Sequence, residues 1–469
     1  MGDKVIKILI GLTILSLLLI LGLILFSPYL LQAYKKEIAE EIGKSVHRKV
    51  EIDKISLSIL SGLSMKVAGL KIHNEPGFAQ PYLLKVVEID LSLEFWPLLR
   101  QRIESREILI RHPEIFIETT AKGISNFKSL EGSKKKPDSL SDAPSVEIIP
   151  GIRISHFIVA DGMISTEDRM SGDKTSLQGI GIEIDKVELL PPQPGKSLME
   201  EIKTEGAVRI GKGKINAFEF EDLSGKYQFE KMVLKLKNWT LRGYGGKISG
   251  ELNLDLNSAL PRYQAAGRIE KLNLKELITG TTSAGDVLEG DFYADLKADG
   301  KGFALQEMKK QLTGNGTFNL RNGVLKTVNL ARQISLLTRV REVGAFRSNE
   351  ETPIEYLKGE FSISEGKMKF STLQGKIPEG EIQGSGAVDF DRNLDFKMKL
   401  VMSQEMTAKI PENSRAYLAG SGGEGEIPFT MTGKADAPQV RLETGEIARK
   451  AAKEGVRKGV ESLLNRFKP

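Results

Sequence analysis

The chain has 469 residues, 40% of them hydrophobic and 28% charged, which is the composition of a folded protein with room for more than one domain. Its formal net charge of +5 is small for this length, and with only two tryptophans it offers neither the basic surface nor the stacking platforms of a nucleic-acid-binding protein. The absence of cysteine excludes disulfides, thiolate metal sites and cysteine nucleophiles.

The first predicted element is an apolar segment that runs without a charge from Ile8 to Phe26. About 20 such residues cross the hydrocarbon core of a bilayer, so we expect a transmembrane anchor over residues 8–28. A cleaved signal peptide is the alternative, but its apolar region usually spans only about 7–15 residues. The residues expected to contact lipid are Ile8, Leu15, Ile20 and Phe26.

The charges around this segment predict its orientation. Lys4 and Lys7 precede it, which favours a cytoplasmic N-terminus under the positive-inside rule. The long body that follows is then expected in the periplasm, with the protein as a single-pass component of the cell inner membrane. An apolar face with helical spacing indicates a helix over Tyr29–Arg48.

From Val50 onward the hydrophobic period changes to two, which is typical of strands with one apolar and one polar face. The segments 87–95 and 394–402 show this alternation most clearly. We therefore divide the chain into a cytoplasmic N-terminus (1–7), the anchor (8–28), an N-terminal β-region (29–130), a linker (131–145), a central β-region (146–300), a C-terminal β-region (301–444) and a terminal helix (445–469).

Part of the β-rich body is repeated. Residues 229–256 align without gaps on residues 363–390, each segment reading as a strand, a glycine-rich turn and a second strand. Such a unit extends a sheet rather than building a pocket. The identical pairs are Lys235/Lys369, Gly246/Gly380, Ile248/Ile382, Gly250/Gly384 and Asp255/Asp389.

The chain ends in a basic amphipathic helix over residues 445–469. Two interpretations stay open: a cap that packs on the last strands, or a foot that contacts an anionic membrane surface or a partner.

Catalytic motifs are not apparent. The four histidines are isolated and lack metal-ligand spacing, and residues 243–247 resemble a phosphate loop only superficially, because strands flank them on both sides. We predict no catalytic residue, no metal and no cofactor.

Several short motifs, in order along nearly the whole chain, resemble the AsmA family of Gram-negative envelope proteins. The resemblance implies an elongated β-groove related to the TamB and VPS13-like bridge proteins. It also implies a role in moving phospholipid or maintaining outer-membrane lipid homeostasis. The motifs lie at Leu91–Leu99, Ile108–Ile115, Gly123–Leu130, Leu312–Gly316, Asn322–Val324 and Ile427–Pro438.

The expected fold is mainly β: a transmembrane helix, then an elongated, curled antiparallel β-groove of repeated strand-turn units, with a few short helices and a C-terminal amphipathic helix. Amphipathic strands also build closed sandwiches and barrels, so a filled core is the alternative to an open groove. The residues predicted to line the groove are Met232, Leu234, Leu236, Leu252, Leu254, Leu256, Met368, Phe370, Val388, Phe390, Leu394, Phe396, Met398, Leu400 and Met402.

Two functions follow from these alternatives. An open groove favours a protein that binds or conducts membrane phospholipid. A filled core favours a non-enzymatic assembly factor for outer-membrane proteins, acting through strand edges or helices. The expected partners are phospholipids, the inner membrane through residues 8–28, and a protein of the outer membrane or envelope, without nucleic acid.

Overall fold

The computed structural model describes residues 34–58, 63–98, 103–127, 152–185, 187–189, 203–258, 260–281, 287–302, 305–330, 332, 351–408, 418, 424–443, 445, 449 and 452. The predicted anchor (8–28), the linker (131–145) and nearly all of the terminal helix (445–469) lie outside these residues. Within the described part of the chain, no helix is both long enough and apolar enough to span a bilayer.

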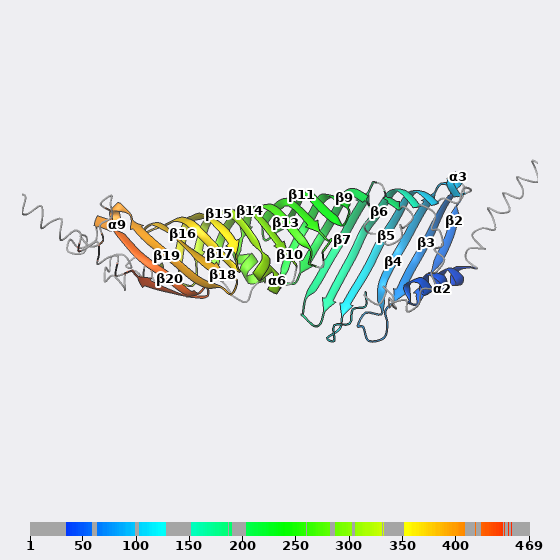
Figure 1. The fold of residues 1–469 in the computed structure, drawn as a ribbon, viewed down its shortest axis with the longest axis horizontal. Coiled ribbons are helices and arrows are strands. Elements are labelled where there is room, and N and C mark those ends of the chain that lie inside the picture. The colour runs from blue at the N-terminus through cyan, green and yellow to red at the C-terminus, as the bar shows by residue number, and fades with distance from the viewer. Residues whose placement is uncertain are drawn as a thin grey trace, which may run out of the picture. The chain divides into compact units, whose positions relative to one another are not determined.

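The chain divides into two units, up to Trp239 and from Thr240. The predicted domain boundaries remain predictions. The first unit contains α2 (Lys35–Val46), β1 (Val50–Glu51), β2 (Lys54–Ser58), β3 (Leu63–His73), β4 (Tyr82–Leu93), α3 (Phe95–Leu98), β5 (Ile103–Thr119), β6 (Ile152–Asp168), β7 (Lys174–Ile184), β8 (Val187–Leu189), β9 (Lys203–Ile215) and β10 (Phe218–Glu230) (Figure 1).

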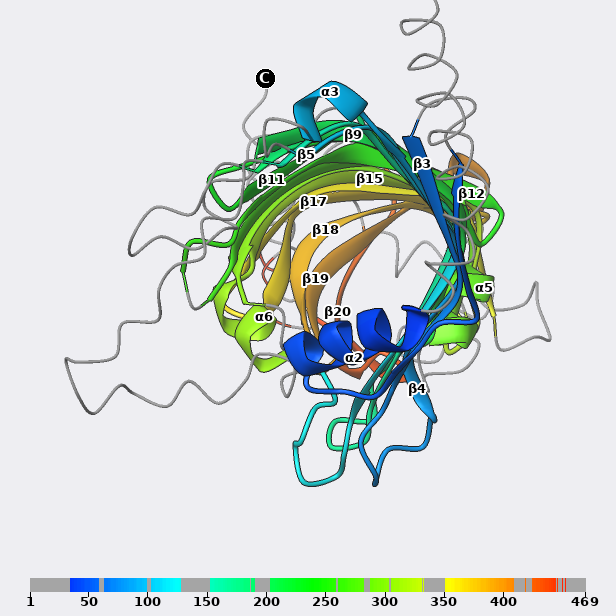
Figure 2. The same ribbon diagram turned by 90° about the vertical axis from the view of Figure 1, so that its right-hand side faces the viewer.

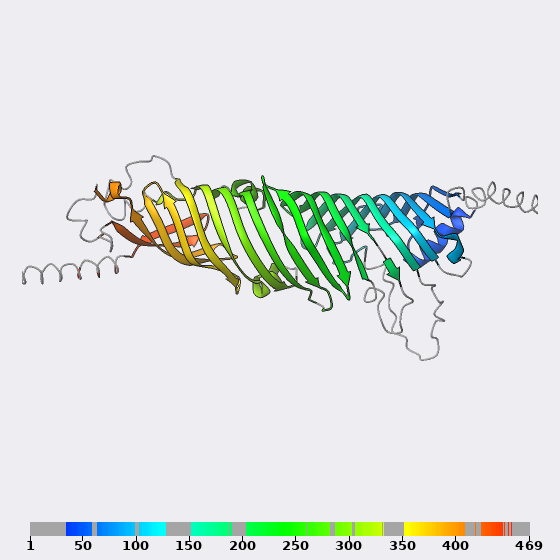
Figure 3. The same cartoon turned by 90° about the horizontal axis from the view of Figure 1, so that it is seen from above.

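Strand β11 (Val233–Gly243) contains the boundary between the units. The second unit, whose strands are seen from another side in Figure 3, contains β12 (Gly246–Asp255), β13 (Arg262–Asn273), α5 (Leu274–Thr281), β14 (Leu288–Lys301), α6 (Leu305–Gln311), β15 (Thr313–Leu325), β16 (Thr352–Ser364), β17 (Lys367–Ile377), β18 (Gly380–Asp389), β19 (Asn393–Met402), α9 (Gln404–Ala408), β20 (Glu426–Lys434) and β21 (Ala437–Leu442).

In the second unit, each strand from β12 to β21 pairs antiparallel with the next. Figure 2 looks along the succession of strands and shows β15, β17, β18 and β19 one behind another, bent in an arc that does not close. A mainly β fold with a curled, unclosed sheet and a few short helices is therefore confirmed.

The first unit corrects one feature of the prediction, because its strands are not all antiparallel. Strands β5 and β6 pair in parallel, from Ile103 opposite Ile152 to Thr119 opposite Asp168. A parallel pair needs a crossover connection rather than a hairpin. The residues that provide it, 128–151, include the segment that we interpreted as a linker. Strand β7 then pairs with β9, while β8 pairs with β6.

Bends occur at matching places in neighbouring strands of the first unit. His112 in β5 and Asp161 in β6 both have left-handed backbone angles, φ 48° and 55°, and His112 Nδ1 lies 2.9 Å from Asp161 Oδ2. The ladder between β6 and β7 shifts register from Val159 to Gly162. Such bulges bend a strand and increase its twist, which favours a curled sheet.

The predicted repeat matches the strands residue for residue. Its alignment places the first and last residues of β11 and β12 on those of β17 and β18. The connections that follow the two copies of the repeat differ in length but begin alike, with an aspartate that accepts a hydrogen bond from the backbone two residues later. The carboxylate of Asp255 accepts a hydrogen bond from the backbone of Asn257, and that of Asp389 accepts them from Asp391 and Asn393.

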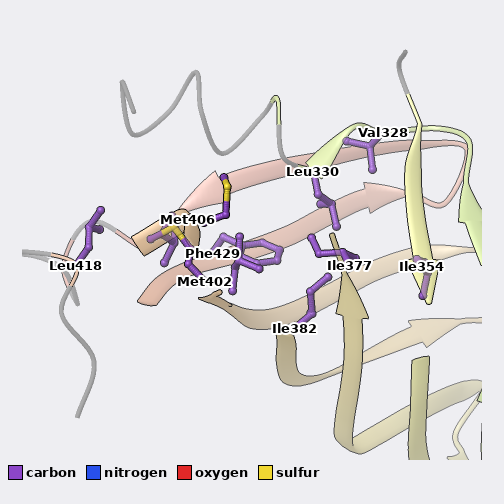
Figure 4. Close-up of a cluster of buried hydrophobic side chains, with 11 residues drawn as sticks. Val328, Leu330, Ile354, Ile377, Ile382, Met402, Met406, Leu418 and Phe429 are labelled. Atoms are coloured by element: carbon purple, nitrogen blue, oxygen red, sulfur yellow. The ribbon is translucent and has the colours of Figure 1, made fainter. Parts of the chain in front are cut away.

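Two hydrophobic clusters contain much of the buried apolar surface. One packs α2 against β1–β3, around Ala39, Val50, Ile52 and Ile55. The other lies in the second unit and is shown in Figure 4. Its members are Val328, Leu330, Ile354, Ile377, Ile382, Leu400, Met402, Met406, Leu418, Ile427 and Phe429.

Candidate functional site

The candidate site is one face of the sheet in the second unit. Strand β19 shows how the sequence produces it, because its even-numbered residues from 394 to 402 are apolar and Asn393, Asp395, Lys397 and Lys399 alternate with them. Successive residues of a strand point to opposite faces, so the register of the ladders determines which side chains of neighbouring strands share a face.

Three consecutive rows on this face cross all ten strands from β12 to β21 without a polar side chain. Each row follows the pairing register from strand to strand. Row one is Ile248, Ile269, Ala294, Phe318, Gly359, Leu373, Gly384, Met398, Phe429 and Leu442. Row two is Gly250, Gly267, Leu296, Gly316, Phe361, Phe370, Gly386, Phe396, Met431 and Val440. Row three is Leu252, Ala265, Ala298, Gly314, Ile363, Met368, Val388, Leu394, Gly433 and Pro438.

The opposite face is polar at the corresponding positions. Ser249, Arg268, Asp295, Thr317 and Glu360 follow one another across β12 to β16. Arg268 Nε lies 2.7 Å from Asp295 Oδ1, and this contact raises the pKa of the arginine. The sheet therefore separates a water-compatible face from an apolar one.

Several phenylalanines on the apolar face pair with glycines of neighbouring strands. The ring centroids of Phe318 and Phe370 are 5.6 Å apart, and those of Phe370 and Phe396 are 5.7 Å apart. Phe361 pairs with Gly316, and Phe396 pairs with Gly386. Each ring thus lies beside a position without a side chain. Large and small residues fit together in this way on the inner side of a curved sheet, where space is limited.

A hollow of about 780 Å³ follows row two. It is lined by the row-two residues of β12 to β16 and, in greater number, by residues of the polar face, among them Ser249, Arg268 and Asp295, so it does not belong to the apolar face alone.

The apolar face is covered at one set of strand ends and open at the other. Leu400, Met402 and Ile427 are at most 1% exposed, because α9 and the segment Val328–Leu330 pack over them. Thr352 Oγ1 fixes that segment, since it accepts a hydrogen bond from Leu330 N (2.9 Å) and donates one to Val328 O (2.6 Å). Row three, at the other ends of the strands, is only half-buried along β17 to β19.

The structure brings most of the predicted groove residues onto one face. Ten of them share the apolar face of β12, β17, β18 and β19: Leu252, Leu254, Met368, Phe370, Val388, Leu394, Phe396, Met398, Leu400 and Met402. The last two lie in the packed cluster rather than on the open part.

The remaining five lie elsewhere. Leu234 and Leu236 lie on β11, next to the boundary between the units, and Met232 lies in the preceding turn with φ 60°. Leu256 follows the end of β12, and Phe390 lies in the turn after β18. None of the predicted anchor residues (Ile8, Leu15, Ile20 and Phe26) is among the described residues.

The face also contains residues that were not predicted from the sequence: the apolar residues of β13–β16, β20 and β21, and the glycines between them. Phe318, Phe361 and Phe429 alternate with polar neighbours as the residues of β19 do, so the same pattern could have identified them. The glycines carried no such signal. Their place on the face follows only from the register.

The first unit has an apolar face of the same kind. One row crosses seven strands from β3 to β10: Val67, Ile89, Ile110, Val159, Ile182, Val208 and Gly225. A second row beside it consists of Met65, Leu91, Ile108, Phe157, Ile184, Gly206 and Tyr227. On the polar face, Lys66 and Arg111 each pair with Glu88 and Asp90.

Among the described residues, no group of three histidine, aspartate or glutamate side chains is placed to hold a metal ion. Most titratable groups with shifted pKa values belong to surface contacts, such as Glu289, whose pKa is lowered by its hydrogen bond from Lys275. Burial raises the pKa of Tyr227 and of Tyr263.

Comparison with known proteins adds a family assignment. The sequence model of the AsmA family matches residues 3–199 and again residues 197–373, which together cover most of the chain. A search of curated proteins gave no match.

Proposed function

The chain belongs to the AsmA family, and from that premise we propose that it binds phospholipid acyl chains on its apolar β-face and conducts them along it. In this proposal the protein is held in the inner membrane by residues 8–28, and its body lies in the periplasm. It supports the lipid homeostasis of the outer membrane and acts without a catalytic residue or cofactor.

The observation that carries the proposal is the continuity of the three apolar rows in the second unit. Adjacent strands lie about 4.8 Å apart, so ten strands extend the rows over roughly 43 Å. The hydrocarbon core of a bilayer is ~30 Å thick, so one lipid layer occupies about half of that. The rows are therefore longer than one acyl chain, which favours a track over a pocket for one lipid.

The energetics favour the same interpretation. A lipid in water exposes its acyl chains, and each CH₂ group that is removed from water contributes ~0.8 kcal/mol. The half-buried side chains of row three also remain partly in contact with water. When acyl chains contact the three rows, the apolar surface of the lipid and that of the protein are both removed from water, and no specific polar group is required.

The test is lipid retention by the full chain, extracted from an envelope and analysed by native mass spectrometry with lipid extraction. We expect co-purifying phospholipid that is lost in Leu252→Asp and Leu394→Asp, which place a charge on half-buried positions of row three. Lys397→Asp, on the polar face of the same strand, is the matched control and should retain lipid.

The folded state of each variant is checked by its thermal unfolding. A stably folded wild-type chain without lipid would overturn the proposal and would favour the assembly-factor interpretation, in which strand edges or helices contact an envelope protein.

A further inference from the structure

Helix α2 covers the start of the apolar face in the first unit. Ala39 is buried in the cluster with Val50, Ile52 and Ile55, and Ile38, Ile42 and Val46 pack against it. Met65 and Val67 of β3 belong to the same contact. These two residues are also the first members of the two apolar rows that cross to β10. The helix therefore occupies surface that is continuous with the apolar face of the first unit.

The two ends of α2 are held very differently. At its C-terminal end, Arg48 is buried, donates a hydrogen bond to Asn126 O (3.0 Å) and pairs with Glu75 (2.5 Å). At its N-terminal end, Tyr34 provides no side-chain cap, and Lys35 Nζ donates an exposed hydrogen bond to Asp53 O, which lies between β1 and β2. His47, which lies between the last helical residue and Arg48, has a left-handed backbone conformation with φ 54°.

The apolar stripe of α2 is also thin. Its members Ile38, Ile42 and Val46 follow at steps of four, and of the whole helix only Ala39 is buried. The charged residues of the helix, such as Glu41 and Lys44, pair with one another at the surface. When the helix leaves the sheet, the cluster around Val50, Ile52 and Ile55 loses its cover, and an acyl chain that takes the place of the helix removes the same apolar surface from water again.

We propose that the surface of β1–β3 beneath α2 is a loading site for one acyl chain of a phospholipid, and that α2 competes for it from within the chain. The helix leaves the site by turning about its end at His47 and Arg48, and the arriving chain then contacts Met65 and Val67. This inference rests on the proposed function, because it assigns to that apolar face the place where lipid enters.

The absence of cysteine allows a direct test in the full chain. Ala39→Cys places a thiol between α2 and the sheet, and its reaction with a polar maleimide reports the departure of the helix. The probe is dihexanoyl-phosphatidylcholine below its micelle concentration. At ten times its Kd for the open form, a probe that binds only that form raises the ratio of open to closed chains about tenfold, and the labelling rate should rise by the same factor while the open form is rare.

Two control variants separate this movement from other changes. Glu41→Cys lies on the exposed side of the same helix and should react quickly with or without the probe. Leu83→Cys is buried in β4, outside the α2 cluster, and its slow reaction should not change. A p-benzoylphenylalanine at Val67 provides a second readout, cross-linking to α2 without the probe and to the probe when it is present.

The outcomes distinguish the inference from the proposed function. If the probe binds the chain in equilibrium dialysis but the labelling rate of Ala39→Cys stays constant, α2 is a permanent part of the core. The proposed loading site would then be wrong. Absence of binding to any part of the chain would overturn the proposed function itself. Faster labelling of Leu83→Cys as well would show unfolding of the unit, which also contradicts the inference.

Discussion

The ring of Phe361 lies against Gly316 of the neighbouring strand, so closely that a Cβ on Gly316 would come within 2.7 Å of Cζ of the ring. The pair is one of several on the apolar face in which an aromatic ring occupies the space left by a glycine. The glycine therefore determines the position of the phenylalanine ring on this face, because any side chain at residue 316 would overlap the ring.

Gly316→Ala is expected to destabilise the second unit by about 1–3 kcal/mol, because the methyl group must displace the ring and press on the backbone of Asp295. Gly267→Ala, in the same row, is the matched control. Its Cβ would meet Ser249 O at 3.4 Å, an ordinary contact, so its effect should stay within about 1 kcal/mol of either sign. Urea denaturation of both variants measures the difference, and equal destabilisation would contradict the packing argument.

Thr352→Val is expected to loosen the cover over Leu400 and Met402. The substitution keeps the shape but leaves Leu330 N and Val328 O without the hydroxyl that binds both, at a cost of about 1–3 kcal/mol for each buried group left unpaired. Hydrogen exchange at residues 328–330 should accelerate. Thr430→Val removes only an exposed bond of 3.4 Å to Arg441 O and serves as the control. Unchanged exchange in Thr352→Val would show that apolar packing alone holds the cover.

Asn126→Asp is expected to destabilise the first unit strongly. The side chain of Asn126 is fully buried, accepts a hydrogen bond from Glu118 N and donates two, to Asn74 Oδ1 (3.0 Å) and Phe116 O (2.9 Å). An aspartate loses both donors and places a buried charge beside two acceptors, at a cost of several kcal/mol. Asn238→Asp, at an exposed position of the first unit, is the control for the added charge. Equal thermal stability of the two variants would contradict this interpretation.

The turn at Asp389 should weaken in acid. Hydrogen bonds from the side chain and backbone of Asn393 lower the pKa of Asp389 below its usual value of 3.8. A carboxylate whose pKa is lower in the folded state than in the unfolded state stabilises the fold. This contribution is complete at pH values above the unfolded-state pKa, and it is lost as the pH falls through the folded-state pKa. We therefore expect exchange of the Asn393 amide, corrected for its intrinsic pH dependence, to accelerate only below about pH 4.

In Asp389→Asn, the amide oxygen still accepts a hydrogen bond but the group does not titrate in this range. The acceleration of Asn393 amide exchange below pH 4 should therefore disappear. The same acceleration in the variant would assign the effect to another group.

How far the sequence determines this fold differs from one element to another. The alternation in β19 and the repeat of two strands were visible directly, because a period of two and a glycine-rich turn are local properties. The parallel pairing of β5 with β6 was not, because the strand pattern is the same in either direction and the crossover decides it.

The candidate site shows the same division between local and long-range information. The face of Leu394 and Met398 was predicted from their own strand. The cover over Leu400 and Met402 comes from Val328, Leu330 and Met406, which approach from other parts of the chain. Contacts of that kind leave no periodic signal in either segment, so the sequence could not distinguish open from covered positions.

The repeat of two strands has a consequence for how such a protein changes in size. Since β11 and β12 correspond in length and turn to β17 and β18, a whole hairpin can be inserted or lost without moving any side chain to the other face. One extra strand would instead reverse the direction of every strand that follows. Growth by pairs of strands would lengthen the sheet in increments of about 9.6 Å. The reach of the apolar track is therefore a quantity that gene duplication can adjust in fixed steps.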